Sequence, residues 1–274
     1  MNISVFGLGI IGSHCADNLT AGNHQITTWN RTPKKRDDSV TSASEAARKS
    51  EILCFYLKDG IACRETFEAL RPALTSNHTL INHSTVDLDT TKWLAEQCSA
   101  LGTAFLDCPF TGSKVAALNC ELVYYAGGSE VLIEELRPIL NVTSKEIIRL
   151  GDIGAATIVK VATNLISAST VQALSEGMAI AKAHGVSPDT FIPAVLSNAC
   201  GSRLASMKLP AMANGDFDTH FSLDNMRKDS ALAIKLAEQA GLSTPGIEAT
   251  STTITSLCES GYAALDYSVL YKQF

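Results

Sequence analysis

The chain opens with an apolar run, Ile3–Phe6, that leads directly into a G-x-G-x-x-G sequence. A run of that length predicts a buried parallel strand. In such a turn Gly7 leaves the strand sharply, Gly9 lets the backbone approach a pyrophosphate, and Gly12 lets the next helix pack closely. The predicted helix would offer free N–H groups and a positive dipole end to the phosphates. A glycine turn without a ligand is the alternative, but the flanking strand and helix favour a dinucleotide site. Its residues would be Gly7, Leu8, Gly9, Ile10, Ile11 and Gly12.

The end of the second predicted strand, Gln25–Trp29, bears on the choice of cofactor. An enzyme that uses NAD usually carries Asp or Glu here, to bind the ribose 2′-hydroxyl. This chain continues instead with Asn30, Arg31 and Thr32, and Lys35 follows shortly after. Arg31 can bind a 2′-phosphate bidentately, and Thr32 and Lys35 can add donors. The loop therefore predicts NADP(H) rather than NAD(H), with a solvated basic loop as the alternative.

The chain divides into two halves of different character. Over residues 1–152 short apolar runs alternate with helical patterns, which predicts an α/β fold with a Rossmann, doubly wound parallel sheet. The strands then stop, and about thirty residues of helical pattern run to Ala183 with few charges. A helix so apolar is buried on most faces, and we expect it to join the domains or to lie at a subunit interface. Residues 153–274 are predicted to form an all-α domain.

Composition excludes several classes of protein. The 274 residues carry a net charge of −6, which argues against a nucleic-acid partner. The sequence has no stretch of 18 apolar residues, so no membrane span is expected, and no signal peptide is visible. Eight scattered cysteines without C-x-x-C spacing indicate reduced thiols and a cytoplasmic protein. The histidines show no metal-binding spacing, so no metal is expected. His83 precedes Ser84-Thr85, and it either lines a site or packs in the core.

Three groups of polar residues fall where chemistry is expected. Ser84-Thr85 and Asp107–Lys114 each follow a predicted strand, and Lys160 and Asn164 lie four apart on one helix face. Burial of Lys160 on an apolar face would lower its pKa towards a range useful for proton transfer. Alternatively, Lys160 lies at the helix edge and reaches water.

Together these motifs resemble the β-hydroxyacid dehydrogenase family. That family includes 3-hydroxyisobutyrate dehydrogenases, tartronate semialdehyde reductases and glyoxylate/succinic semialdehyde reductases. The resemblance spans nearly the whole chain. The matching motifs are the glycine turn, Ser84-Thr85-Val86-Asp87, the loop from Asp107 to Ser113, Lys160-x-x-x-Asn164 and Lys228-Asp229. The stretches Ser84-Thr85-Val86-Asp87 and Thr111-Gly112-Ser113-Lys114, with Asn30-Arg31-Thr32, are most similar to the glyoxylate/succinic semialdehyde branch, which uses NADPH.

The resemblance implies a role for each matching residue. Lys160 would be the catalytic lysine and Asn164 the amide that orients the substrate. Leu57 would lie near the adenosine and ribose, and Thr85 near the nicotinamide and the substrate. The remaining assignments are the carboxylate-binding loop of Thr111, Gly112 and Ser113, and a C-terminal set that closes over substrate and nicotinamide, namely Phe221, Lys228 and Asp229. Lys228 would also contact the cofactor.

Two departures from the family pattern bear on the substrate. Cys120 stands where the family has a glycine, and Ala155-Ala156 replace a second glycine before the long helix. The expected activity is NADPH-dependent reduction of a small oxo acid, of the glyoxylate or succinic semialdehyde type, by a homodimer or homotetramer. The alternatives are an NAD(P)-dependent 3-hydroxyisobutyrate or tartronate semialdehyde enzyme, an imine reductase of the same plan, and a dinucleotide-binding adaptor without catalysis.

Overall fold

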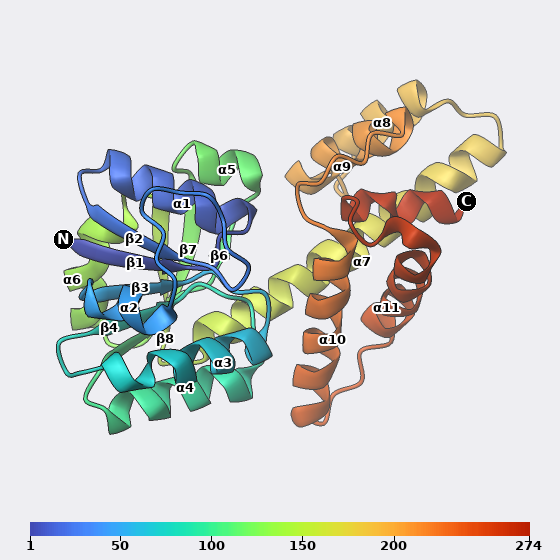
Figure 1. Cartoon of the computed structure of the whole chain (residues 1–274). Helices are drawn as coiled ribbons and strands as arrows, with labels where there is room; N and C mark the ends of the chain where they lie inside the picture. The colour runs from blue at the N-terminus through green and yellow to red at the C-terminus, as the bar shows by residue number, and fades with distance from the viewer. The chain divides into compact units, whose positions relative to one another are not determined.

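The computed structural model describes residues 1–274 and forms two compact units. The first unit is Met1–Lys160 and the second is Val161–Phe274. The first contains every strand of the protein, and the second is built from helices (Figure 1). The α/β fold class, with an N-terminal Rossmann domain and a C-terminal helical domain, is thereby confirmed.

Eight strands form one sheet in the first unit, in the order β2-β1-β3-β4-β5-β7-β6, with β8 paired to β7. From β1 the chain adds β2 on one side, and then β3, β4 and β5 on the other side, which is the change of direction typical of a doubly wound fold. The strand bounds are β1 (Asn2–Phe6), β2 (Gln25–Trp29), β3 (Ile52–Phe55), β4 (Thr79–Asn82), β5 (Ala104–Asp107), β6 (Phe110–Thr111), β7 (Leu122–Gly127) and β8 (Ser144–Gly151).

The sheet is parallel from β2 to β5 and mixed at its far edge. β7 runs antiparallel to β5 and to β6, and β8 runs parallel to β7. The predicted doubly wound parallel sheet is therefore correct from β2 to β5 and needs correction only at this edge. β6 follows β5 after two residues and pairs with β7 as the arm of a hairpin closed by a short helix, so the chain turns back and does not cross over the sheet.

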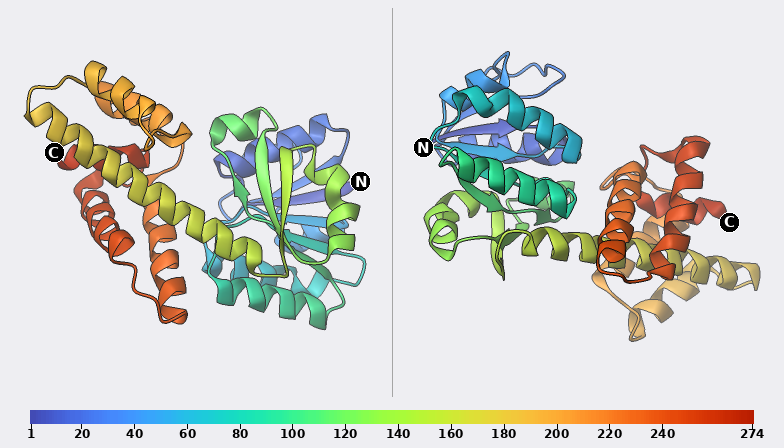
Figure 2. Two further views of the ribbon diagram at one scale, coloured as in Figure 1. Left: turned by 180° about the vertical axis from the view of Figure 1, so that it is seen from behind. Right: turned by 90° about the horizontal axis from the view of Figure 1, so that it is seen from below.

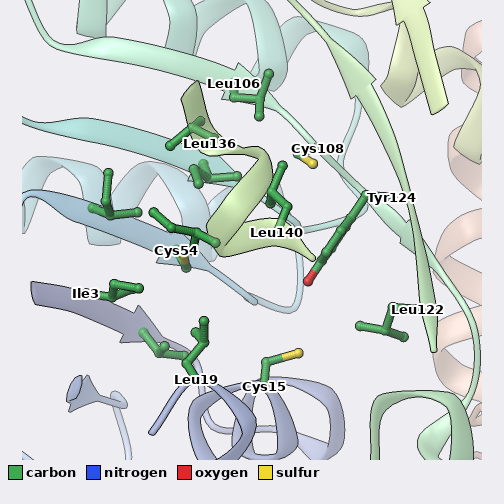
Figure 3. Close-up of a cluster of buried hydrophobic side chains, with 14 of the residues drawn as sticks. Ile3, Cys15, Leu19, Cys54, Leu106, Cys108, Leu122, Tyr124, Leu136 and Leu140 are labelled. Carbon is green, nitrogen blue, oxygen red and sulfur yellow. The ribbon is translucent and has the colours of Figure 1, made fainter. Parts of the chain in front are cut away.

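Helices cover both faces of the sheet (Figure 1). One face carries α1 (Ile10–Ala21), α5 (Lys114–Leu118) and α6 (Glu130–Leu140), and the other carries α2 (Ala43–Arg48), α3 (Gly60–Leu70) and α4 (Leu88–Ala100). Figure 3 shows the core on the first face, where side chains of α1 and α6 meet those of the strands, among them Ile3, Cys15, Leu19, Cys54, Leu106, Leu136 and Leu140. Burial of these apolar side chains is what holds the layers together.

The long helix α7 (Ala155–Ala183) has 29 residues and continues from the first unit into the second (Figure 2). A separate apolar core surrounds its later turns. The other elements of this unit are α8 (Pro188–Ser197), α9 (Arg203–Asn214), α10 (Leu223–Gln239), α11 (Pro245–Leu257), a π-helical turn (Cys258–Tyr262) and a 3-10 helix (Tyr267–Gln273). None of the helices combines the length and the apolar character that crossing a membrane requires.

All eight cysteines are free thiols, and five of them are buried in the first unit. Cys200 is exposed, and Cys120 and Cys258 are partly buried. Cys120 has φ +59°, a left-handed backbone conformation that a residue with a Cβ adopts at a cost. The resemblance implies a glycine where Cys120 stands, and glycine adopts this backbone conformation without steric cost.

Candidate active site

The glycine turn between β1 and α1 has the geometry that a pyrophosphate needs. Gly7 has φ +97°, and a Cβ on Gly12 would lie 2.0 Å from the carbonyl oxygen of Gly7. A Cβ on Gly9 would meet no atom within 4 Å, so the face above Gly9 is open. No side chain caps α1. The first N–H groups of this helix therefore have no capping side chain, and the turn fits a dinucleotide phosphate.

Two side chains brace the turn from the end of β2. The amide of Asn30 accepts from Leu8 N–H at 2.8 Å and donates to the carbonyl of Thr32 at 2.6 Å. The ammonium of Lys34 donates to the carbonyl of Leu8. Sequence reasoning identified Asn30 but did not assign Lys34, although Lys34 belongs to the same basic run. Asn30 thus fixes the turn against the loop after β2, and Lys34 places a positive charge beside it.

The basic loop presents three exposed candidates for a 2′-phosphate. Arg31, Thr32 and Lys35 are all exposed, and the Arg31 guanidinium lies 3.6 Å from the carboxylate of Glu65 on α3. That ion pair is open to solvent on both sides and is correspondingly weak. Arg36 is engaged elsewhere, because it binds the Asp38 carboxylate with two donors at 2.9 Å.

Leu57 and Thr85 follow β3 and β4, two adjacent strands of which β3 pairs with β1. The Leu57 side chain lies 3.1 Å from where a Cβ on Gly7 would be, so it packs against the glycine turn. Its backbone N–H donates to the Ser84 hydroxyl at 2.8 Å, which joins the two loops. Thr85 is partly buried directly after that hydroxyl. Both predicted residues therefore lie at the carboxyl edge of the sheet, where open α/β sheets bind ligands.

The predicted substrate loop is a defined turn between β6 and α5. Thr111 pairs with Val123 in β7, and Gly112 has φ +130°, which a residue with a Cβ adopts only with strain. Ser113 precedes α5, but its hydroxyl does not cap that helix. The Thr111 and Ser113 hydroxyls and the backbone of Gly112 lie on three successive residues, an arrangement suited to a carboxylate.

Asp107, at the end of β5, is wholly buried and caps the start of α7. Its carboxylate accepts from the N–H groups of Gly154 and Thr157, each at 3.0 Å, and from the Thr157 hydroxyl at 2.8 Å. Burial raises the pKa of Asp107 to about 6, although these hydrogen bonds favour the charged form. Sequence reasoning placed Asp107 in the substrate loop but missed the cap, because its partners lie about fifty residues away.

Lys160 lies on α7, three residues after Thr157, and is 8% exposed. Its ammonium lies 6.0 Å from the ring centroid of Phe110 in β6, next to Thr111. The structure therefore brings the predicted catalytic lysine to the strand that leads into the predicted substrate loop. The burial of Lys160 favours the interpretation of a buried lysine suited to proton transfer over that of a lysine at the helix edge that reaches water.

Asn164 lies one turn further along α7, in the second unit. Its amide donates to the Asp229 carboxylate at 2.6 Å, and the Lys228 ammonium lies 3.0 Å from the other oxygen of that carboxylate. Phe221 packs edge-on against Tyr267, with ring centroids 6.0 Å apart. The second unit thus brings Asn164, Lys228 and Asp229 together, and Phe221 belongs to its core surface.

His83 is a core residue of the first unit. Its ring stacks on Tyr56 with centroids 4.5 Å apart and an interplanar angle of 18°, and its Nδ1 lies 2.7 Å from the Cys108 carbonyl. Since a carbonyl only accepts, Nδ1 carries the proton. Burial lowers the pKa of His83 to about 4, so the ring is neutral at pH 7. Of the two readings left open by the sequence, the structure favours packing.

Comparisons with known proteins agree with this geometry. The model for the NAD-binding domain of 6-phosphogluconate dehydrogenase matches residues 2–151. The model for the NAD-binding domain of NADP-dependent 3-hydroxyisobutyrate dehydrogenase matches residues 154–274. The chain belongs to the β-hydroxyacid dehydrogenase family. It is therefore an oxidoreductase with a nicotinamide-cofactor domain, and the predicted resemblance is confirmed.

Several known proteins are similar to this chain over nearly its whole length. Glyoxylate/succinic semialdehyde reductase 1 of Arabidopsis thaliana is 29% identical, with 99% of this chain and 98% of that protein covered. The chloroplastic reductase 2 of the same plant is 28% identical, with 99% and 79% covered. A structure of Mycobacterium tuberculosis 3-hydroxyisobutyrate dehydrogenase with L-serine has a TM-score of 0.91 at 23% identity, covering 99% of this chain and 98% of that one.

Proposed function

We propose that the protein reduces a small oxo acid, of the glyoxylate or succinic semialdehyde type, to the hydroxy acid with NADPH. The observation that carries the proposal is the buried Lys160 beside Phe110, next to a loop of hydroxyl and N–H donors. A buried ammonium beside a carboxylate-binding loop suits a substrate that bears both a carboxylate and a reducible carbonyl. The names of the Arabidopsis relatives support the same substrate class.

The proposed roles follow from the chemistry of the reaction. The reduced nicotinamide, when bound, supplies the hydride. The hydroxyls of Thr111 and Ser113 and the backbone at Gly112 hold the substrate carboxylate, and Thr85 lines the same edge of the sheet. The Lys160 ammonium stabilises the negative charge that develops on the carbonyl oxygen and donates a proton to it, which contributes about 10²–10⁴-fold. Asn164 would orient the substrate oxygen. Phe221, Lys228 and Asp229 are proposed as further substrate residues, and Lys228 as a cofactor contact.

The proposed preference for NADPH rests on the loop after β2. The phosphate-binding candidates Arg31, Thr32 and Lys35 are exposed, and no carboxylate ends β2 to bind a ribose hydroxyl. Because the Arg31–Glu65 pair is solvent-exposed, a doubly charged phosphate can replace Glu65 at little cost. We expect Arg31→Ala to weaken NADPH binding about tenfold and to leave NADH binding unchanged. Arg48→Ala, an exposed arginine at the end of α2, is the matched control. Equal affinities of the wild type for the two cofactors would refute the preference.

The activity is tested by following NADPH oxidation with glyoxylate, succinic semialdehyde, tartronate semialdehyde, methylmalonate semialdehyde and a cyclic imine. Turnover on an oxo acid supports the proposal, whereas turnover on the imine alone would favour an imine reductase. Lys160→Ala should lower kcat by about 10²–10⁴-fold while NADPH still binds. Lys182→Ala removes an exposed lysine from the same helix and should leave kcat unchanged. Tight NADPH binding without turnover on any substrate would favour an adaptor.

We also propose a division into a cofactor domain, residues 1–152, and a helical domain, residues 153–274, in a cytoplasmic homodimer or homotetramer. The five buried free thiols support a reducing compartment. Helix α8 supports self-association, because it is largely apolar and none of its residues is buried. Light scattering after gel filtration measures the subunit number, and a monomer at micromolar concentration would contradict this part of the proposal.

A further inference from the structure

The carboxylate that caps the start of α7 comes from a residue far away in the sequence. The cap comes from Asp107, 47 and 50 residues before its two backbone donors. The N–H groups of a first helical turn need acceptors, and a negative charge there also interacts favourably with the helix dipole. A Ser or Asn directly before the helix would satisfy this need without burying a charge. A carboxylate on β5 does one thing more, because it fixes the helix against the strand.

The segment that follows Asp107 is held at each step. Cys108 donates its N–H to the Asn82 carbonyl at 2.9 Å, and the Pro109 carbonyl accepts from Tyr125 N–H at 2.9 Å. Phe110 and Thr111 then pair with β7. The path from Asp107 to Thr111 is therefore fixed to the sheet on both sides. A helix that is hydrogen-bonded to Asp107 is therefore held in a fixed position relative to the proposed carboxylate-binding loop.

The first turn of α7 connects Lys160 to the segment from Asp107 to Thr111. Thr157, which gives Asp107 two of its three hydrogen bonds, lies on the same helix face as Lys160, since residues three apart are neighbours. At the other end, the Lys160 ammonium faces Phe110, three residues after Asp107. A closed path thus runs from the Asp107 carboxylate through one helical turn to Lys160, and back through Phe110.

We propose that Asp107, acting through Thr157, is a positioning residue that sets where the Lys160 ammonium lies relative to the substrate loop. The inference rests on the proposed function and adds to it the residue that fixes the position of the catalytic lysine. A displacement of about 1 Å between reacting groups can cost about 10²-fold in rate. Loss of the contact should therefore lower kcat and leave NADPH binding, which depends on the turn between β1 and α1, unchanged.

The Thr157 hydroxyl offers a test with matched variants. It lies 2.8 Å from Asp107 and 2.9 Å from the Thr91 hydroxyl of α4. Thr157→Val keeps the shape and removes the hydroxyl, Thr157→Ser keeps the hydroxyl, and Thr91→Val breaks the pair with α4 but leaves Asp107 untouched. We expect kcat to fall about tenfold in Thr157→Val and to stay within twofold of wild type in the other two variants. Asp107→Asn, if it folds, should show the larger loss, about 100-fold.

The expected result is that loss of kcat follows the Asp107 contact, with the Kd of NADPH within twofold throughout. Wild-type kcat in a folded Thr157→Val protein, or an equal loss in Thr157→Ser, would overturn the inference. So would an equal loss in Thr91→Val, because α4 and not Asp107 would then hold the helix.

A second readout keeps the inference testable if the wild type turns over no oxo acid, a result that would refute the proposed function alone. The rate at which acetic anhydride acylates Lys160, followed by mass spectrometry against exposed Lys182, reports how firmly the buried amine is held. We expect this ratio to rise severalfold in Thr157→Val and to stay at the wild-type value in Thr157→Ser. An unchanged ratio in Thr157→Val would contradict the positioning role.

Discussion

The buried ring of His83 should make stability depend on pH in a way that one substitution removes. In the folded protein its pKa is lowered from 6.5 to about 4, because the ring is buried. The unfolded chain therefore binds a proton between pH 6.5 and pH 4 that the folded chain does not, and stability rises with pH in that window. The contribution is complete above pH 6.5 and is lost as pH falls towards 4. From the two pKa values, lowering the pH from 7.5 to 5 should cost about 2 kcal/mol of unfolding free energy.

His83→Phe is the perturbation, since a phenyl ring can keep the stacking on Tyr56. It leaves the Cys108 carbonyl without its donor, which lowers stability by about 1–3 kcal/mol at every pH. The prediction concerns the difference between wild type and variant, which should shrink by about 2 kcal/mol between pH 7.5 and 5. Asp107, whose raised pKa has the opposite effect on stability, is present in both proteins.

Urea unfolding followed by fluorescence at half-unit pH steps measures this difference. His184→Gln, at an exposed position at the end of α7, is the control and should run parallel to wild type. If wild type and His83→Phe stay parallel from pH 7.5 to 5, the ring is not held neutral by burial. The assignment of His83 to the core would then be wrong.

Three further predictions concern single substitutions. Cys120→Gly should raise the unfolding free energy by about 0.5–1 kcal/mol, because the left-handed backbone at φ +59° no longer opposes a Cβ, and a thermal melt would show it. Gly9→Ala should weaken cofactor binding at least tenfold with an unchanged melting temperature, whereas Gly12→Ala should lower the melting temperature, since its Cβ would lie 2.0 Å from a carbonyl oxygen. Lys208→Met should cost about 3–5 kcal/mol in urea unfolding, because it leaves the buried Asp266 carboxylate without the ammonium 2.7 Å away; a loss below 1 kcal/mol would contradict this.

The parts of the fold that local pattern determines were predictable from the sequence. The strand at the glycine turn, the strand Gln25–Trp29 and the long helix that ends at Ala183 agree with the structure, because periodicity and flanking turns specify such elements. β8 escaped prediction because it is charged and half exposed at the sheet edge, with Lys145 and Glu146 among its residues. The reversal of β7 escaped as well, because strand direction depends on pairing partners and not on local pattern.

The candidate site divides in the same way. Position in the sequence drew attention to Lys160 and to the segment Asp107–Lys114, and the family resemblance assigned the carboxylate to Thr111–Ser113. The structure places Lys160 beside the strand that enters this loop. The Asp107 cap and the Lys34 contact were missed, because each depends on a partner far away in the chain. No spacing rule distinguishes a buried acceptor that serves a remote helix from any other aspartate after a strand.

The uneven exposure of the thiols makes Cys200 a practical handle. Five cysteines are buried in the first unit, Cys120 and Cys258 are partly buried, and burial raises the pKa of Cys258. A maleimide at neutral pH should therefore react first with Cys200, the exposed thiol. A fluorophore on Cys200 would mark the second unit, and Cys120→Ser would remove the partly buried thiol of the first unit that could compete with it. Energy transfer from Trp29 and Trp93, both in the first unit, to such a label would then report whether NADPH alters the separation of the two units.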